Sequence, residues 1–239
     1  MMRKNPVSHS IVGGALLMLL GICGHLTAAD RVAKAVFIEP PNGAPDEVYL
    51  VAPEQSVIKA SLPSRTFSPD IVLPKGDLVL AVLPKPLGED EGIPAGAPTI
   101  EIPKTWSRVY LLFIHDRENK VFPLKVVPID GSKNQFPAGD TRIVNLSAAM
   151  VRGQFGDKVV GVRPGKVGDL DAPINEFGPY PVSIDFMMKG DTKPSPLART
   201  TWQHDPDSRQ VVLITDPDGG KRLRIRALSD RVRVADAGE

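Results

Sequence analysis

Cysteine is almost absent from this sequence. The single cysteine, Cys23, lies close to the N-terminus. The rest of the chain therefore cannot form a disulfide framework, a cysteine nucleophile or a cysteine zinc site. An excess of charge of one sign is also lacking, since 29 Lys and Arg residues stand against 28 Asp and Glu residues. This balance excludes a strongly basic nucleic-acid-binding protein. No stretch keeps helical periodicity for three turns, which argues against packed helices.

The first 29 residues predict a secretory signal peptide. Arg3 and Lys4 form a positive start, residues 11–20 are apolar, and Ala28 and Ala29 are small residues suited to cleavage. The apolar stretch 11–26 has 16 residues and is interrupted by glycines, whereas a membrane-spanning helix needs about 20 apolar residues. We therefore expect a periplasmic or secreted protein whose contact with a membrane is limited to the transient signal segment. The alternative is an N-terminal membrane anchor.

Proline is abundant, with 24 residues, and it separates short runs of β-branched and aromatic side chains. Such runs predict strands, and proline at this density opposes long helices. The continuously apolar run 109–114 is typical of a central strand that is buried on both faces. The sequence thus predicts an all-β protein with antiparallel β-sandwich architecture. The predicted strands are 35–38, 47–51, 57–62, 77–83, 99–102, 109–114, 121–127, 142–146, 149–155, 158–162, 182–187, 197–202, 211–215 and 223–227.

The two halves of the chain resemble each other. In each half a tryptophan leads into an apolar run, an aspartate, a polar turn, a second run and a second aspartate. The apolar alternation slips by one residue after the turn, and two unrelated hairpins could also converge on such a pattern. We interpret the pattern as two related halves of about 100 residues, each the size of a small sandwich. The corresponding residues are Trp106, Asp116 and Asp130 in one half and Trp202, Asp216 and Asp230 in the other.

The polar segment 131–140, with its Gly and Pro residues, is the natural seam between these halves. The expected division is a signal peptide at 1–29, a first half at 30–132 and a second half at 133–239. The sequence leaves open whether the halves are two separate domains or share one core.

A row of arginines near the C-terminus is the strongest indication of a binding site. Arg222, Arg224 and Arg226 alternate with apolar residues, so on a strand their guanidinium groups lie on one face. Residues 221–233 contain six basic residues and one acidic residue. Guanidinium groups bind carboxylate, sulfate or phosphate groups through paired hydrogen bonds, which predicts an anionic ligand. The alternative is a solvated edge strand that is protected by charge against pairing with another edge.

The sequence offers little for catalysis or metal binding. His115 and His204, each followed by an aspartate, are the only histidines after residue 29. No His-Glu-x-x-His motif, nucleophile elbow or complete calcium loop occurs. We therefore expect no enzyme activity, no cofactor and no bound metal. A hydrolase that uses a metal or paired carboxylates is the weaker alternative.

Trp106 and Trp202 could stack on sugar rings, as aromatic side chains of carbohydrate-binding sandwiches do. Their equivalent places in the repeat instead favour a role as core anchors. The main functional prediction is an exported, non-catalytic binding or structural module of the cell envelope. Its expected partner is an envelope protein or an anionic polysaccharide, and not a nucleic acid. The principal alternative is a carbohydrate-binding β-sandwich.

Overall fold

The computed structural model describes residues 31–52, 54, 56–88, 90–217 and 222–232. The predicted signal peptide lies outside these residues. The described residues form sixteen β-strands and no helix. Accordingly, no helix in this part of the chain has the length and apolarity needed to cross a membrane.

The first eight strands form two four-stranded sheets. In sheet A the strand order is β4-β1-β7-β8, and in sheet B it is β3-β2-β5-β6. The strands of sheet A are β4 (Ile71–Leu73), β1 (Arg31–Ile38), β7 (Arg108–His115) and β8 (Leu124–Asp130). Those of sheet B are β3 (Val57–Ser61), β2 (Glu47–Val51), β5 (Leu78–Leu83) and β6 (Thr99–Ile102).

The last eight strands repeat this arrangement. In sheet C the order is β12-β9-β15-β16, and in sheet D it is β11-β10-β13-β14. Adding eight to each strand number of the first half reproduces both orders. The strands of sheet C are β12 (Val167–Leu170), β9 (Thr141–Asn145), β15 (Ser208–Thr215) and β16 (Arg224–Arg231). Those of sheet D are β11 (Lys158–Val162), β10 (Met150–Phe155), β13 (Gly178–Met187) and β14 (Ser195–His204).

The predicted all-β sandwich with two similar halves is confirmed. Most neighbouring strands are antiparallel, as expected, but β1 pairs parallel to β7 and β9 pairs parallel to β15. These parallel pairs lie at the centres of sheets A and C. Their strands need no tight hairpin, because most of each half lies between them in the sequence.

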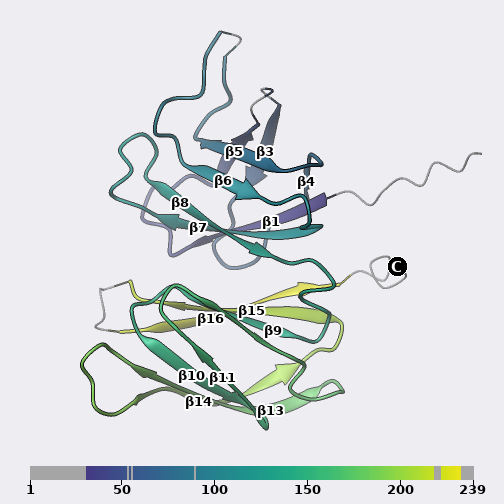
Figure 1. The fold of residues 1–239 in the computed structure, drawn as a ribbon, viewed down its shortest axis with the longest axis vertical. Coiled ribbons are helices and arrows are strands. Elements are labelled where there is room, and N and C mark those ends of the chain that lie inside the picture. The colour runs from purple at the N-terminus through teal and green to yellow at the C-terminus, as the bar shows by residue number, and fades with distance from the viewer. Residues whose placement is uncertain (1–30, 53, 55, 89, 218–221, 233–239) are drawn as a thin grey trace, which may run out of the picture.

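The four sheets stack in the order B, A, C, D (Figure 1). One apolar core lies between sheets A and B, and includes Phe37, Leu80 and Phe113. A second core lies between sheets C and D, and includes Phe155 and Ile214. A third apolar cluster joins sheet A to sheet C, so the two halves are packed together as one stack. Its buried members are Val36, Ile38, Tyr110, Leu112, Ile129, Phe136, Val144, Val211, Leu213 and Leu228.

The core-facing residues explain why the repeat looks imperfect in the sequence. Leu111 of β7 corresponds to Val212 of β15, an offset of 101 residues. After the hairpin, Leu124 of β8 corresponds to Leu223, an offset of 99. The hairpin is therefore two residues shorter in the second half, and the 100-residue spacing is an average.

The change of offset from 101 to 99 residues affects one pair of residues that the sequence repeat suggests. Asp130 lies opposite Val109 on the neighbouring strand, and Asp230 lies opposite Arg209 in the same way. However, Val109 faces the core of its own half. Arg209 and Asp230 contact each other on the other face of their sheet, and Asp230 also accepts a hydrogen bond from the first half. The two aspartates therefore lie on opposite faces of their sheets, and the prediction that they correspond is wrong by one residue.

Candidate functional site

The predicted arginine row faces the first half of the protein. Arg224 and Arg226 lie on β16, at the edge of sheet C, and Arg222 is an exposed residue just before this strand. Arg226 Nη1 donates a hydrogen bond to the carbonyl oxygen of Ser64 at 2.5 Å. Arg224 Nη1 lies 3.5 Å from Glu39 Oε1, and its side chain is 59% exposed. Arg224 and Arg226 are thus part of the junction between the halves, and Arg222 and Arg224 are accessible to solvent.

Glu39 directly follows β1 and has a left-handed backbone conformation, with φ of 51°. Such a conformation is uncommon for residues other than glycine, and it persists where surrounding contacts hold it. Here Thr215 Oγ1 donates a hydrogen bond to Glu39 Oε1 at 3.0 Å. The carboxylate therefore links the end of β1 to both β15 and β16.

A groove of about 510 Å³ lies beside the arginine row. It begins at Pro40, directly after Glu39, and includes Ser64, the residue whose carbonyl accepts the bond from Arg226. We call it the proline groove, because four prolines line it. The other walls are formed mainly by small or apolar side chains. The full lining is Phe37, Pro40, Pro41, Asn42, Gly43, Ala44, Pro45, Asp46, Leu62, Pro63 and Ser64.

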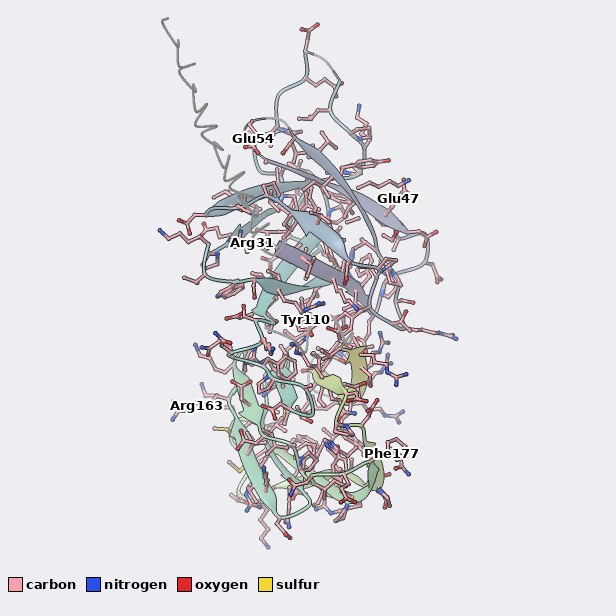
Figure 2. All side chains as sticks on the ribbon, turned by 90° about the vertical axis from the view of Figure 1, so that its right-hand side faces the viewer. Arg31, Glu47, Glu54, Tyr110, Arg163 and Phe177 are labelled. Carbon is pink, nitrogen blue, oxygen red and sulfur yellow. The ribbon has the colours of Figure 1, made fainter. Side chains whose placement is uncertain are left out.

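A buried aspartate stands at the centre of the junction. Asp230 of β16 has a side chain that is 1% exposed. It accepts hydrogen bonds from Lys34 Nζ at 2.5 Å and from the Tyr110 hydroxyl at 2.6 Å, both in the first half. Figure 2 shows Tyr110 near the middle of the long axis of the molecule. Burial, followed by the charge of Asp230, raises the pKa of Tyr110 well above its usual range, so the phenol remains a donor.

Further cations surround this aspartate. Arg108 Nη1 lies 3.5 Å and Arg209 Nη1 4.0 Å from Asp230 Oδ2. A second carboxylate, Asp70, lies 3.7 Å from Lys34 Nζ and 3.6 Å from Arg108 Nη1. We call these groups, together with Tyr110, the central ion cluster. Because its members come from both halves, it fixes the relative position of sheets A and C.

The seam between the halves is held by a second buried arginine. Arg142 of β9 donates to the backbone carbonyl of Asp130 and, at 2.7 Å, to that of Gln135. Its guanidinium carbon lies 4.6 Å from the centre of the Phe136 ring. These contacts satisfy one carbonyl group at the end of β8 and one within the connecting segment, so neither is left without a partner.

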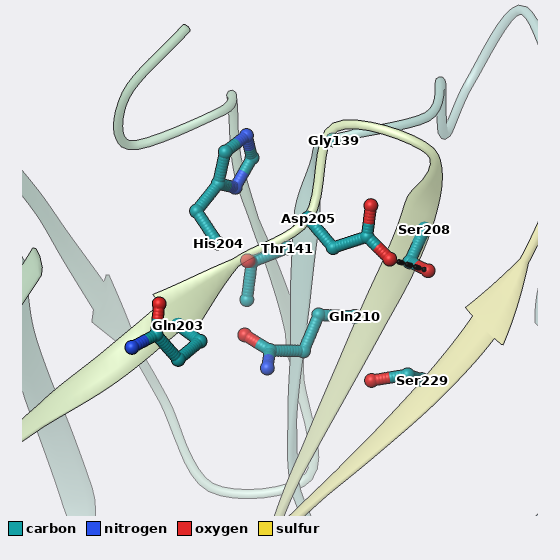
Figure 3. A pocket seen from close by; sticks show the side chains of 8 residues that line it. All are labelled: Gly139, Thr141, Gln203, His204, Asp205, Ser208, Gln210 and Ser229. Atoms are coloured by element: carbon teal, nitrogen blue, oxygen red, sulfur yellow. Dashed lines mark hydrogen bonds between the residues drawn. The ribbon is translucent and has the colours of Figure 1, made fainter. Parts of the chain in front are cut away.

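A small polar pocket lies at one end of the second half (Figure 3). It has a volume of about 30 Å³ and contains His204, which is 5% exposed. His204 Nε2 has no hydrogen-bond partner among the described residues. Burial lowers the pKa of this imidazole, in spite of the opposing charges of Asp205 and Asp140. The residues that line the pocket are Gly139, Thr141, Gln203, His204, Asp205, Ser208, Gln210 and Ser229.

The arrangement in this pocket differs from that of a nucleophilic triad. Ser208 Oγ donates to Asp205 Oδ2 at 2.8 Å, so its proton is directed at the carboxylate and not at the imidazole. His115 lies in sheet A, in the other half of the protein. The two histidines therefore do not share a site. Among the described residues, no group of three or more His, Cys, Asp or Glu side chains is placed to hold a metal ion.

Both tryptophans lie at the margins of the cores. Trp106 packs against the core of the first half and Trp202 against that of the second, and both are partly buried. Trp202 meets the Phe155 ring edge to face, with 5.6 Å between the ring centres. Both indoles therefore contribute to packing, while part of each surface remains in contact with solvent.

Sequence reasoning did not find the central ion cluster or the pocket as a whole. Their residues come from strands that are far apart in the sequence, and nothing in the local pattern says which strands will be neighbours. Arg209 gave no local signal either, because it lies between Ser208 and Gln210 at the polar start of β15, before the apolar run begins.

Comparisons with known proteins add little. No protein-family model matches the sequence, and no curated protein matches it. Among solved structures, the chain is similar to a proposed cell adhesion protein from Bacteroides uniformis, with 9% identity and a TM-score of 0.22. That match covers 86% of this chain and 100% of the other. A TM-score of this size carries no argument about fold or function.

Proposed function

We propose that this protein is an exported, non-catalytic binding module of the cell envelope that holds an anionic partner at Arg222 and Arg224, beside the proline groove. The observation that carries the proposal is the exposure of Arg224 next to this groove, with a long contact to Glu39. A guanidinium so placed can exchange a weak contact of 3.5 Å for shorter, paired hydrogen bonds to a ligand.

The neighbouring surface supports the same proposal. The proline groove has a rigid backbone at its four prolines, so a ligand that lies in it orders few groups on binding. The groove exposes more polar than apolar surface, which suits the hydroxyl groups of a polysaccharide, and the arginines at its edge suit carboxylate or sulfate groups. Export is supported by the signal-like segment at residues 1–29.

Retention on an immobilised anionic polysaccharide, such as polygalacturonate, tests the proposal. Arg222→Gln combined with Arg224→Gln should weaken binding about three- to thirtyfold, since each exposed charge contact contributes about 0.3–1 kcal/mol. Arg226 is left unchanged because it holds Ser64. The matched control is Arg152→Gln with Arg163→Gln, which removes the same charge from exposed positions in the second half.

The wild-type protein and the control pair should be retained equally, and neutral dextran should retain neither. Equal retention of the Arg222/Arg224 variant and the control would show that binding reflects overall charge, and the proposed site would then be wrong. Absence of retention for the wild-type protein at about 50 mM salt, where screening is weak, would also reject it.

A further inference from the structure

The long outer strand β14 has one backbone edge that no described strand covers. It is the last strand of sheet D, and among the described strands it pairs with β13 alone. Residues 199–201 and Gln203 are exposed, so solvent reaches this edge. Sheet D lies at one end of the stack, away from the first half (Figure 1). A second chain can therefore approach β14 from the side.

The pairing of β13 shows which backbone groups of β14 point outward. The amide of Gly156, directly after β10, donates to the Pro181 carbonyl at 2.8 Å, so the Pro181 backbone is directed towards β10. Backbone direction alternates along an antiparallel strand, and Thr201 lies opposite Pro181. The amide and carbonyl of Thr201 therefore point away from β13. Those of Arg199 and Gln203, two residues to either side, do the same.

The other edge strands of the described sheets are all shorter than β14, and most of them carry charge, which opposes pairing with another chain. The equivalent strand of the first half is β6, which has four residues with Glu101 among them. The protection of the remaining edges consists of the three-residue length of β4 and of the charged residues Lys59 in β3, Lys125 in β8, Lys158 in β11, Asp169 in β12, and Arg224 and Arg226 in β16.

The strand β14 lacks comparable protection. It has ten residues, and Arg199 is the only Lys, Arg, Asp or Glu among them. The charge of Arg199 is paired with Asp185 of β13. Pro196 lies beyond the shift of register at Ile184 and Asp185, outside the regular part of the ladder. The segment from Arg199 to Gln203 is thus open for pairing.

This segment is complementary to a second copy of itself. A two-fold axis at Thr201 places the two Thr201 residues opposite each other and Arg199 opposite Gln203 of the partner subunit. The three outward amides of each copy then meet three outward carbonyls of the other, which gives six backbone hydrogen bonds. Arg199 faces an uncharged amide side chain, so like charges do not meet. A symmetric pairing of this kind closes at two chains.

The same pairing covers the exposed part of an indole. Trp202 of β14 is only partly buried at the margin of the core. In the paired strands, Thr200 of the partner subunit lies opposite Trp202 on the same face of the sheet. Apolar indole surface is thereby removed from water, which favours association.

We propose that two copies of this protein associate by antiparallel pairing of their β14 strands, which joins two four-stranded D sheets into one continuous sheet. One pair of strands buries less than the roughly 800 Å² per partner of a typical stable complex, so we expect a dissociation constant on the order of 10–100 µM. The proposal goes beyond the function proposed above and does not depend on it, because Arg222 and Arg224 lie outside β14.

Sedimentation velocity of the full chain between about 5 and 500 µM tests the proposal. The mass should rise from one chain to two and no further. Thr201→Lys and Thr201→Glu each place like charges opposite each other and should each weaken the dimer at least about tenfold. An equimolar mixture of the two variants places a lysine opposite a glutamate, and it should restore association to within about threefold of the wild-type protein.

Two further variants provide a control and a local signal. Thr99→Lys makes the same change at an exposed position on β6, the equivalent edge of the first half, and should leave the dimer unchanged. Trp106→Phe leaves Trp202 as the one tryptophan of the chain, and its emission should move to shorter wavelengths as the dimer forms.

The proposal is overturned by a single-chain mass up to about 500 µM, or by growth beyond two chains. Equal association of Thr201→Lys and Thr99→Lys would also overturn it, as would failure of the mixed variants to associate. Constant Trp202 emission while the mass doubles would place the contact elsewhere. Circular dichroism verifies that each variant is folded. Because these variants keep Arg222 and Arg224, failure here and failure on the anionic polysaccharide are distinguishable.

Discussion

The first half of the protein closes the end of its core with Ala33 and Val109, whereas the second half closes the same end with Thr141 and Gln210. The strand order is shared, so the difference lies in the side chains and not in the fold. The first half keeps continuous apolar packing there, and the second half gives up part of it around a polar pocket. The two halves thus differ at this end in packing, apolar in the first and polar around a small pocket in the second.

The same contrast appears in the hairpins of the outer sheets. In the first half, β5 and β6 are short and joined by a long loop, from which Leu87 and Ala97 pack on the outer face of sheet B. In the second half, β13 and β14 are ten residues each and form a long hairpin whose register shifts between Ile184 and Asp185. The longer β14 carries His204 to the end of the core, which places it in the pocket.

The largest expected effect comes from breaking the contact between the halves. Asp230→Ala leaves Lys34, Arg108 and Arg209 without their shared carboxylate, and we expect a loss of about 3–5 kcal/mol in the free energy of unfolding. Urea denaturation followed by tryptophan fluorescence measures this, since each half contains one tryptophan. Asp157→Ala, at an exposed turn, should change the free energy by no more than about 0.5 kcal/mol. A loss below about 1 kcal/mol for Asp230→Ala would mean that the cluster does not hold the halves together.

A pair of isosteric substitutions then compares the ends of the two cores directly. Val109→Thr buries a hydroxyl among apolar side chains and should cost about 1–3 kcal/mol. Thr141→Val replaces a hydroxyl in a polar wall by a methyl group and should cost less than about 1 kcal/mol. Thermal or urea unfolding of both variants gives the two values. Equal costs would show that the two ends are energetically alike and would remove the basis of the comparison.

The smallest expected effect concerns pH. Burial lowers the pKa of His204 in the folded protein, so the unfolded chain binds a proton more readily. Stability should therefore be unaffected above the ordinary histidine pKa of about 6.5 and should fall as the pH drops below it. Urea denaturation at several pH values between about 5 and 7.5, above the ordinary Asp range, measures this dependence. His204→Asn should reduce the dependence and His115→Asn should not. If both variants retain the full pH dependence, another group causes it.

Much of the architecture was predictable from local patterns. The strand expected at 158–162 is β11, and the one expected at 99–102 is β6, without any shift of the ends. The strand β12 was missed, because Gly168 and Asp169 occupy its middle and have low strand propensity. It pairs with β9 as β4 pairs with β1, so its place in the repeat stabilises it in spite of its composition.

The sites were less predictable than the strands. The alternation of Arg224 and Arg226 correctly placed both on one face of a strand, but it could not show that this face meets Ser64 and Glu39 of the first half. His204 was recognised as a candidate by its residue type. Its burial depends on three strands of sheet C whose neighbours are set by tertiary packing, and the sequence alone does not contain that information in a local form.

The bond between Lys34 and Asp230 has a mechanical consequence. Lys34 lies in β1 and Asp230 in β16, the first and last described strands, and both strands belong to the two central sheets. A pulling force applied through the two ends of the described chain would therefore act first on the contact between sheets A and C. Sheets B and D, at the two extremities, would bear little of that tension. A protein tethered in this way would keep its outer sheets undistorted until the contact between sheets A and C breaks.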